Sequence, residues 1–383
     1  MNPAVQSHKS DSFGRYKRLL PPNAVVIKAR GGDAMSEIER LAAKLEPQLA
    51  KVILAGLQKM GADLDLDLIV SALESGDVGK VVAALQIDPK AAFAELSPAL
   101  QGGIYAAGAA TAASIRLTGA AFAFDQLNPR LITWLQTYNL GLIRQITDST
   151  KEAVRSVLTT GMTQGKNPKD VARQIKGLVG LTERQAKAVA NYRKELESFH
   201  NKRTAGGYGL GNKVNSVNGT QVSILNDDGS STDGINDRRL RDFRFDGQLQ
   251  RAVQTGVPLK PEQIDKMVAA YERKYLAYRA RTIARTEALR TTNMGVQDAW
   301  RQAIEDGAVP EELVRRQWVV AKDERLCEWC SPIPRLNPKR GVKLDQPFAT
   351  PKGPITLPPV HPNCRCTVFI RRWEPEQLQG ETK

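Results

Sequence analysis

The sequence predicts a mainly α fold, in which a multi-helix body precedes a small α+β carboxyl-terminal domain held together by a Cys/His cluster. Two observations support the helical body: apolar residues recur three and four positions apart, and residues typical of helix ends separate these stretches. The third observation is that all four cysteines lie between Cys327 and Cys366. Soft ligands this close together predict a small cross-linked domain.

The composition is that of a folded, soluble protein. The chain has 383 residues, of which 41% are hydrophobic and 25% charged, a length that allows at least two hydrophobic cores. The most apolar stretch, from Tyr105 to Phe124, is rich in alanine and glycine and carries Arg116, so we expect no membrane span. The beginning of the chain lacks the pattern of a secretory leader, and we expect synthesis in the cytoplasm.

Changes in composition predict six segments. They are a basic arm over 1–34, an amino-terminal helical region over 35–121, a helical domain over 122–203, a polar insertion over 204–236, a long helix with the Cys/His carboxyl-terminal domain over 237–372, and a tail over 373–383. The arm has many basic residues and no sustained apolar period, so we expect it to become ordered on a partner.

The amino-terminal helical region begins with an amphipathic helix. Apolar residues from Ile38 to Leu57 recur at helical spacing, which predicts a helix over 35–60 with a kink at Pro47. The helical period continues over 63–87 and 89–96, with breaks at Gly76 and Pro89.

Four helix starts are predicted in the helical domain. Asn128 is a cap, and Pro129 occupies the first turn of a helix to Ile146. The other three are a Ser149–Glu152 capping box before a helix to Thr163, an Asn167 cap before a helix to Leu178, and a Thr182–Gln185 capping box before a helix to Phe199. The three helices that follow Ser149, Asn167 and Thr182 resemble a helix-turn-helix unit in their order and length. They lack an evident basic recognition face, which favours a compact bundle.

The polar insertion is rich in Gly, Asn, Ser and Asp. Asn218-Gly219 and Asp228-Gly229 are typical hairpin turns, so the segment is predicted to include a hairpin at the surface. A loop of this length is either disordered or used for contact with another protein.

A long helix is predicted from Lys260-Pro261 to Gly307. Its apolar stripe, which we expect to be core packing, comprises Ile264, Met267, Val268, Tyr271, Tyr275 and Tyr278. At about 1.5 Å per residue, an unbroken helix to Ile304 would be roughly 65 Å long. Gln317–Val320 and Thr367–Ile370 are predicted to be strands on either side of the Cys/His cluster.

The Cys/His cluster consists of Cys327, Cys330, His361, Cys364 and Cys366. Pairs of thiolate and imidazole ligands, separated by a loop of about thirty residues, are typical of a zinc site. Five donors are available for four tetrahedral positions, so His361 and Cys366 compete for the last one. Two disulfides, or four inert buried thiols, are the alternatives to a metal ion.

A structural zinc site is favoured over a catalytic one. A hydrolytic site needs an open coordination position and a general base, which Cys/His nucleases usually take from a second histidine nearby. The other histidines, His8 and His200, are far away in the sequence. We therefore expect no enzymatic activity, with a metal-dependent DNA nuclease as the alternative.

The charge points to a polyanionic partner. The chain has a net charge of +14, and residues 315–372 contain twelve Lys or Arg against four Asp or Glu. A basic, compact domain is typical of proteins that contact nucleic acid, although a solvated charged face is the alternative. The sequence shows no motif that reads bases, so we expect nonspecific contact with DNA phosphates.

Several motifs together resemble the phage Mu F-like head morphogenesis family of tailed bacteriophages. They are Thr282-Ile283-Ala284-Arg285-Thr286-Glu287, then Asn293, Gly295 and Ala299, then Trp318 through Asp323-Glu324-Arg325 to Cys327 and Cys330, and finally His361-Pro362-Asn363-Cys364-Arg365-Cys366. Phe124-Asp125, Asn128-Pro129, Trp134 and Arg239-Leu240-Arg241-Asp242 are similar to the upstream pattern of the family. The resemblance covers residues 122–372, and the carboxyl-terminal run is its specific part.

The resemblance implies a minor head, or minor capsid, protein without enzymatic activity of its own. It would be made in the host cytoplasm and associate in few copies with the portal protein, with the major capsid or scaffold protein as a further partner. It would remain in the virion, inside the capsid near the portal vertex. Roles in DNA packaging or ejection would follow from that location, and a nonspecific DNA-binding or ejection factor without a portal contact is a further alternative.

Within the motif, Arg285 and Glu287 are two positions apart on a helix and so do not share a face. Our hypothesis is that Arg285 pairs with a carboxylate or a phosphate, and that Glu287 connects the long helix to the Cys/His cluster.

Overall fold

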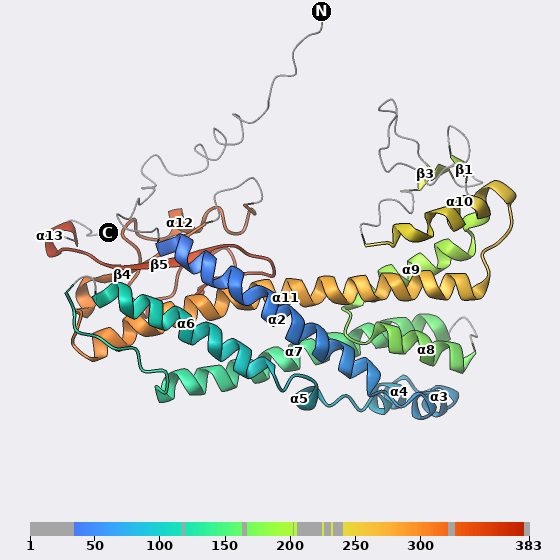
Figure 1. Cartoon of the computed structure of the whole chain (residues 1–383), viewed down its shortest axis with the longest axis horizontal. Coiled ribbons are helices and arrows are strands. Elements are labelled where there is room, and N and C mark those ends of the chain that lie inside the picture. The colour runs from blue at the N-terminus through green and yellow to red at the C-terminus, as the bar shows by residue number, and fades with distance from the viewer. Residues whose placement is uncertain are drawn as a thin grey trace, which may run out of the picture. The chain divides into compact units, whose positions relative to one another are not determined.

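The predicted mainly α fold is confirmed by the computed structural model (Figure 1). It describes residues 34–116, 119–162, 167–201, 203–204, 224–225, 231–232, 240–320 and 326–378. The chain forms two compact units, each assembled from separate stretches of sequence. The first includes 34–53, 95–139 and 281–378, and the second includes 54–94 and 140–280. Helices α2, α7 and α11 each contribute residues to both units.

The first unit contains helix α6 (Leu96–Arg116) and parts of α2 (Ala34–Ala62), α7 (Pro129–Met162) and α11 (Pro261–Glu305). Small residues allow these helices to approach one another closely. A Cβ atom added at Gly103 would lie 2.2 Å from Leu45 Cδ2, and one added at Gly108 would lie 2.3 Å from the Phe124 ring. The alanine- and glycine-rich stretch of the sequence is therefore a packing surface, as expected for a bundle.

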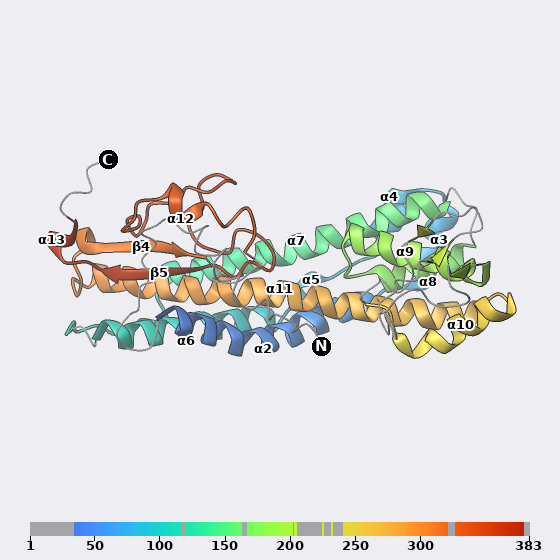
Figure 2. The same cartoon turned by 90° about the horizontal axis from the view of Figure 1, so that it is seen from above.

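A two-stranded antiparallel sheet completes the first unit. Strand β4 (Val314–Val319) pairs with β5 (Thr367–Arg372) in a register that places Trp318 opposite Val368. Figures 1 and 2 both place this pair beside the carboxyl-terminal half of α11. The buried Asn293 side chain of α11 accepts a hydrogen bond from the Val368 backbone N–H at 3.0 Å. A polar side chain thus connects the long helix to the sheet.

Three short elements surround this sheet in the carboxyl-terminal domain. They are the 3-10 helix η4 (Glu311–Leu313), helix α12 (Ile333–Leu336) and helix α13 (Pro375–Leu378). The predicted strands are confirmed, and the domain has the expected mixture of short helices and strands.

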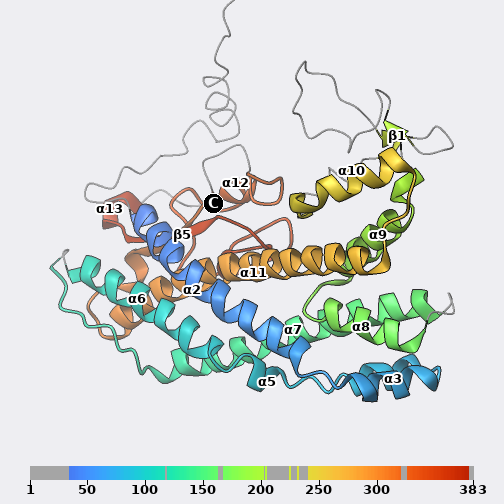
Figure 3. The ribbon, with the colours of Figure 1, turned by 45° about the vertical axis from the view of Figure 1, so that its right-hand side comes forward.

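The second unit is a helical bundle (Figure 3). Its shorter elements are α3 (Leu66–Glu74), α4 (Val78–Ala84), α5 (Pro89–Ala92), α8 (Pro168–Leu178), α9 (Glu183–Glu197), η1 (Phe199–Asn201), η3 (Phe243–Phe245) and α10 (Asp246–Thr255). Tyr192, Phe199 and Tyr271 are almost completely buried in its core. The predicted apolar stripe of the long helix is core packing from Ile264 to Tyr271, whereas Tyr278 is 45% exposed.

Most of the predicted helix ends are confirmed. Asn128 Oδ1 accepts a hydrogen bond from Arg130 N–H at 3.0 Å, and Asn167 Oδ1 accepts one from Lys169 N–H at 2.9 Å. Thr182 and Gln185 form a reciprocal capping box. The long helix extends without interruption from Pro261 to Glu305, and Pro47 lies inside a continuous α2.

The predicted helix start at Ser149 and Glu152 is wrong. Helix α7 continues through both residues, and Ser149 Oγ–H donates to the Ile146 carbonyl at 2.9 Å rather than capping a new helix. The Ser149 hydroxyl also accepts a hydrogen bond at 2.6 Å from the buried Arg279 guanidinium, which donates to the Gly180 carbonyl as well. Ser149 is therefore an acceptor for a buried cation.

The expected basic arm up to residue 33, residues 379–383 of the expected tail, and most of the polar insertion, including its two proposed turns, lie outside the described residues. Residues 373–378 of the expected tail are described and include α13. Three two-residue strands of the insertion are described: β1 (Arg203–Thr204), β2 (Ile224–Leu225) and β3 (Ser231–Thr232). They pair antiparallel in the order β1-β2-β3. Among the described helices, none combines the length and the apolar character needed to span a membrane.

Gly295 is predicted to be intolerant of a side chain. A Cβ atom there would lie 2.3 Å from the Ile104 carbonyl oxygen and 2.9 Å from Ala107 Cβ, so α6 and α11 would have to separate. We expect Gly295→Ala to lower the free energy of unfolding by about 1–3 kcal/mol, measured by urea denaturation. Gly102→Ala is the control, because nothing lies within 4 Å of that position; it should be neutral or stabilise its helix by up to about 1 kcal/mol. Equal effects of the two changes would contradict the close approach.

Glu272 is predicted to make the stability of the protein depend on pH. Its carboxylate packs on Gly177, and burial raises its pKa to about 7, against the opposing effects of Arg193 and Arg273 and with a smaller contribution from Asp265. The folded state therefore holds this proton more tightly than the unfolded state, so stability should fall as the pH rises from about 4.5 to about 7 and then level off.

Glu272→Gln should remove this dependence. Above pH 7 we expect the variant to be more stable than the wild type by up to roughly 3 kcal/mol, the free energy equivalent of the pKa shift. Thermal unfolding at several pH values measures the effect, with the exposed Glu262→Gln as the control. A glutamine variant that keeps the wild-type pH profile would show that Glu272 is not responsible.

Candidate metal centre

The structure brings all five predicted ligand residues together in the loop region between β4 and β5. His361 Nε2 lies 3.0 Å from Cys327 Sγ and 3.3 Å from Cys330 Sγ, and Cys330 Sγ lies 3.7 Å from Cys364 Sγ. Their ligand atoms form two groups of three, Cys327–Cys330–His361 and Cys330–Cys364–Cys366, each within 4.8 Å. Cys330 belongs to both groups and is therefore the centre of the cluster.

Tight turns position these ligands. The backbone N–H groups of Cys330 and Ser331 both donate to the Cys327 carbonyl, at 3.2 and 3.0 Å. On the other side, Cys364 N–H donates to the His361 carbonyl at 3.1 Å, and Asn363 adopts a positive φ of 59°. Asparagine tolerates this conformation better than most residues. The His-Pro-Asn-Cys sequence thus forms a turn that directs both ligands to the same point.

The imidazole of His361 is oriented for metal binding. Its Nδ1 lies 2.9 Å from the Pro362 carbonyl oxygen, an acceptor to which Nδ1–H can donate. A neutral histidine that carries its proton on Nδ1 has a lone pair on Nε2, which is the nitrogen that faces the two thiols. This arrangement is typical of a histidine ligand.

The donor set fits a tetrahedral metal ion. Two thiolates about 2.3 Å from one zinc ion are about 3.8 Å apart, close to the 3.7 Å between Cys330 and Cys364. All four cysteines are free rather than joined in disulfides. Hydrogen bonds among the thiols of Cys330, Cys364 and Cys366 lower the pKa of Cys364 and raise that of Cys330. Against the opposing hydrogen bond with Cys330, the hydrogen bond to Cys364 together with burial raises the pKa of Cys366. Without a metal ion, the negative charge in this group is therefore favoured on Cys364. The cluster can therefore hold a metal ion.

The buried Arg316 of β4 organises the loop that carries the second half of the cluster. Its side chain has no exposed surface, and its guanidinium donates to the Thr356 carbonyl at 2.7 Å, to the Lys343 carbonyl at 3.3 Å, and to the Gln346 carbonyl and the Gln297 side chain. The guanidinium also lies 4.8 Å from the centre of the Phe348 ring. Burial lowers the pKa of Arg316 to about 10, so the group remains charged at neutral pH.

The Cys/His cluster is attached to α11 through Thr286 and Arg290. Asn363 N–H donates to Thr286 Oγ1 at 3.1 Å, and Arg290 donates to the Pro359 carbonyl at 3.2 Å. Glu287, for which we expected this role, is buried and instead accepts a hydrogen bond from the Tyr138 hydroxyl of α7. Burial raises the pKa of Glu287. Its ion pair with Arg290, at 3.8 Å, connects it to the cluster only indirectly.

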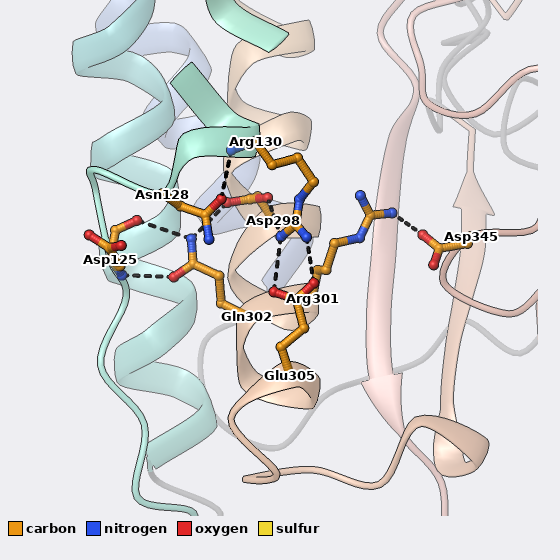
Figure 4. Close-up of polar contacts among 8 residues, drawn as sticks. All are labelled: Asp125, Asn128, Arg130, Asp298, Arg301, Gln302, Glu305 and Asp345. Atoms are coloured by element: carbon orange, nitrogen blue, oxygen red, sulfur yellow. Dashed lines mark hydrogen bonds and ion pairs between the residues drawn. The ribbon is translucent and has the colours of Figure 1, made fainter. Parts of the chain in front are cut away.

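A second polar network joins the beginning of α7 to the end of α11 (Figure 4). Gln302 exchanges two hydrogen bonds with the Asp125 backbone, at 2.7 and 3.0 Å, and donates to the fully buried Asp298 at 2.8 Å. Arg130 pairs with Asp298 and Glu305, and Arg301 pairs with Asp345. All of these charged groups except Asp298 line a cavity of about 350 Å³. Because the charged groups pair with one another, we interpret the network as structural.

Sequence reasoning missed Arg316, Thr286, Arg290 and Gln302. Arg316 has a detectable signal, since a strand that alternates buried and exposed residues places it on the same face as Trp318. The Asp323-Glu324-Arg325 segment of the motif and Arg239 lie outside the described residues.

Cys330→Ser is predicted to abolish metal binding, because Cys330 is shared by both groups of ligands. We expect the wild type to contain a stoichiometric metal ion by elemental analysis and to lose thermal stability in a chelator. The variant should contain none and should not respond to the chelator. His200→Ala, a histidine outside the cluster, is the control. A variant that retains the ion would exclude this site.

Arg316→Met is predicted to destabilise the protein, because several buried carbonyl groups would lose their donor. We expect a loss of about 2–4 kcal/mol in the free energy of unfolding, together with weaker metal retention. Arg315→Met, at the neighbouring position on the other face of β4, should cost less than about 0.5 kcal/mol. Similar losses for the two variants in urea denaturation would show that the buried hydrogen bonds are not the cause.

The predicted resemblance to a known family is confirmed over part of the chain. Comparison with curated proteins finds no match, and neither does comparison with solved structures. A family model described as Phage Mu protein F like protein matches residues 245–369, a segment from α10 through α11 and β4 to the Cys/His cluster and the first half of β5. Residues 245–369 are therefore similar to the phage Mu protein F like family.

Proposed function

We propose that this chain is a minor head protein of a tailed bacteriophage that acts in head morphogenesis by binding the portal vertex and contacting packaged DNA through phosphates. The match over residues 245–369 carries this proposal. The matched segment includes the ligands of the candidate metal centre and the helix on which that centre rests. The support for the proposal therefore lies in a segment that contains both the candidate metal centre and the part of α11 to which it is attached.

The proposed metal is a structural zinc ion held by Cys327, Cys330, His361 and Cys364. The orientation of His361 favours it over Cys366 as the fourth ligand, because its Nε2 already faces two of the thiols. When bound, zinc would cross-link the two ends of the loop between β4 and β5 and so contribute to folding. Cys366 would remain as a buried thiol beside the site.

The proposed DNA contact depends on the exposed basic residues of the carboxyl-terminal domain. Exposed examples are Arg335, Lys339, Lys343, Lys352 and Arg372. Arg316 is buried, Arg301 pairs with Asp345 and Arg372 lies 3.9 Å from Glu374, so these three contribute less to the charge available to a partner. The remaining cations are suited to phosphates, which attract positive charge without regard to sequence.

The proposed partner is the portal protein, with the major capsid or scaffold protein as further contacts. The location proposed for the assembled protein is the interior of the capsid near the portal vertex, where a basic domain would meet packaged DNA. The support for these partners is the family resemblance, which implies a low-copy component of the head.

Three experiments test the proposed function. A tagged portal protein should co-purify this chain from infected cells, and purified heads should contain it. Absence from both would exclude a head protein.

Incubation of purified protein with plasmid and Mg²⁺ or Mn²⁺ tests the nuclease alternative. Cleavage of the plasmid that Cys330→Ser abolishes would assign an enzymatic role to the Cys/His cluster instead.

DNA binding is predicted to weaken steeply as salt is added. Replacing Lys339 and Lys343 with Gln should weaken binding to all DNA sequences alike. It should also reduce the slope of log affinity against log salt concentration by about two, because two phosphate contacts are lost. Fluorescence anisotropy over a range of NaCl concentrations measures this, with the exposed Lys51→Gln as the control. A salt dependence that is flat in the wild type would contradict phosphate contacts.

A further inference from the structure

A tryptophan side chain is exposed at the surface of the Cys/His cluster. Trp329 lies between Cys327 and Cys330 and is 42% exposed. The other tryptophans of the domain are covered: Trp318 is 5% exposed and packs on Phe348, and the Arg371 guanidinium lies 3.5 Å from the centre of the Trp373 ring. The tight turn at Cys327–Ser331 fixes the backbone that carries Trp329. The indole is thus presented to solvent from a constrained position.

The ammonium group of Lys352 lies over the ring of this indole. Its Nζ is 4.8 Å from the centre of the Trp329 ring. The backbone of Lys352 belongs to a turn in which Thr350 Oγ1 accepts a hydrogen bond from Lys352 N–H at 3.2 Å and Gly353 N–H donates to the Thr350 carbonyl at 3.0 Å. Gly353 has a φ of 92°, a conformation that favours glycine. Local structure therefore places a cation over one face of a partly exposed aromatic ring.

The surrounding loop is positively charged. Residues 328–356 contain five Lys or Arg and two Asp or Glu, and one of the two acids, Asp345, pairs with Arg301. The positive charge of this loop is complementary to the negative charge of a phosphate backbone.

We propose that Trp329 and Lys352 bind an unpaired nucleotide of single-stranded DNA, with the base stacked on the indole and the adjacent phosphate paired with the ammonium group. This inference rests on the proposed DNA contact and adds a preference for unpaired strands. Bases inside a duplex are stacked on one another, so an exposed indole can stack only on a base that is unpaired or terminal. An aromatic ring within a basic surface is the arrangement by which single strands are bound without sequence preference.

Affinity measurements on the full chain test the stacking. Fluorescence anisotropy would compare a labelled oligothymidylate of about 20 nucleotides with a duplex of equal length. We expect Trp329→Leu to weaken binding of the single strand roughly 5- to 100-fold and to leave duplex binding and the salt dependence unchanged. Trp329→Phe, which keeps an aromatic face, should retain most of the affinity. Leu336→Ala, at a neighbouring residue that is 50% exposed, is the control for general apolar contact and should have no effect.

The outcomes separate this inference from the proposed function. If the wild type binds both DNAs and Trp329→Leu binds the single strand normally, or loses both affinities equally, the stacking is overturned and the phosphate contact remains. If the wild type binds neither DNA at low salt, the proposed DNA contact itself fails. Quenching of tryptophan fluorescence by the oligothymidylate is a second measurement, for which the conservative variant Trp329→Phe is sufficient. We expect quenching in the wild type and its loss in Trp329→Phe. Unchanged quenching in Trp329→Phe would overturn the proposal.

Discussion

The buried guanidinium of Arg316 is the interaction on which the carboxyl-terminal domain depends. The loop between β4 and β5 has little regular secondary structure, so its carbonyl groups need partners other than a strand or a helix. Arg316 supplies several donors from one point in the core, and it reaches carbonyls at residues 343, 346 and 356. By fixing the loop on β4, it brings residues 361–366 back towards Cys327 and Cys330, and the metal ligands can then meet.

Other buried polar side chains replace backbone partners in the same way. Asn293 accepts a hydrogen bond from the first part of β5, Gln302 pairs with the backbone of Asp125 as a strand would, and Arg279 donates to the carbonyl that follows α8. Each of these groups would be costly to bury without its partner. A helix such as α11 therefore does more than pack: its polar residues determine where neighbouring irregular segments lie.

The sequence was sufficient to predict the helices with strong end signals and the members of the Cys/His cluster. Asn128, Asn167 and Thr182 act on backbone groups within a few positions, so their role can be inferred locally. Ser149 has the same local pattern but is an acceptor for Arg279, 130 positions later in the chain. Likewise, nothing in the neighbourhood of Glu287 indicates that Tyr138 donates to it. Residues whose function is set by a distant segment could not be assigned from local patterns. For this reason the contact to the turn of the cluster was expected from Glu287, whereas Thr286 makes it.

The division of the chain into discontinuous units constrains the order in which it can fold on the ribosome. The first unit combines residues 34–53 with residues 281–378, so α2 remains without part of its core until residues 281–378 have been made. During synthesis, apolar residues of α2 such as Leu45 and Leu49 lack their final covering. Such a nascent chain is exposed to aggregation, and binding of a chaperone or of an assembly partner during translation would protect it.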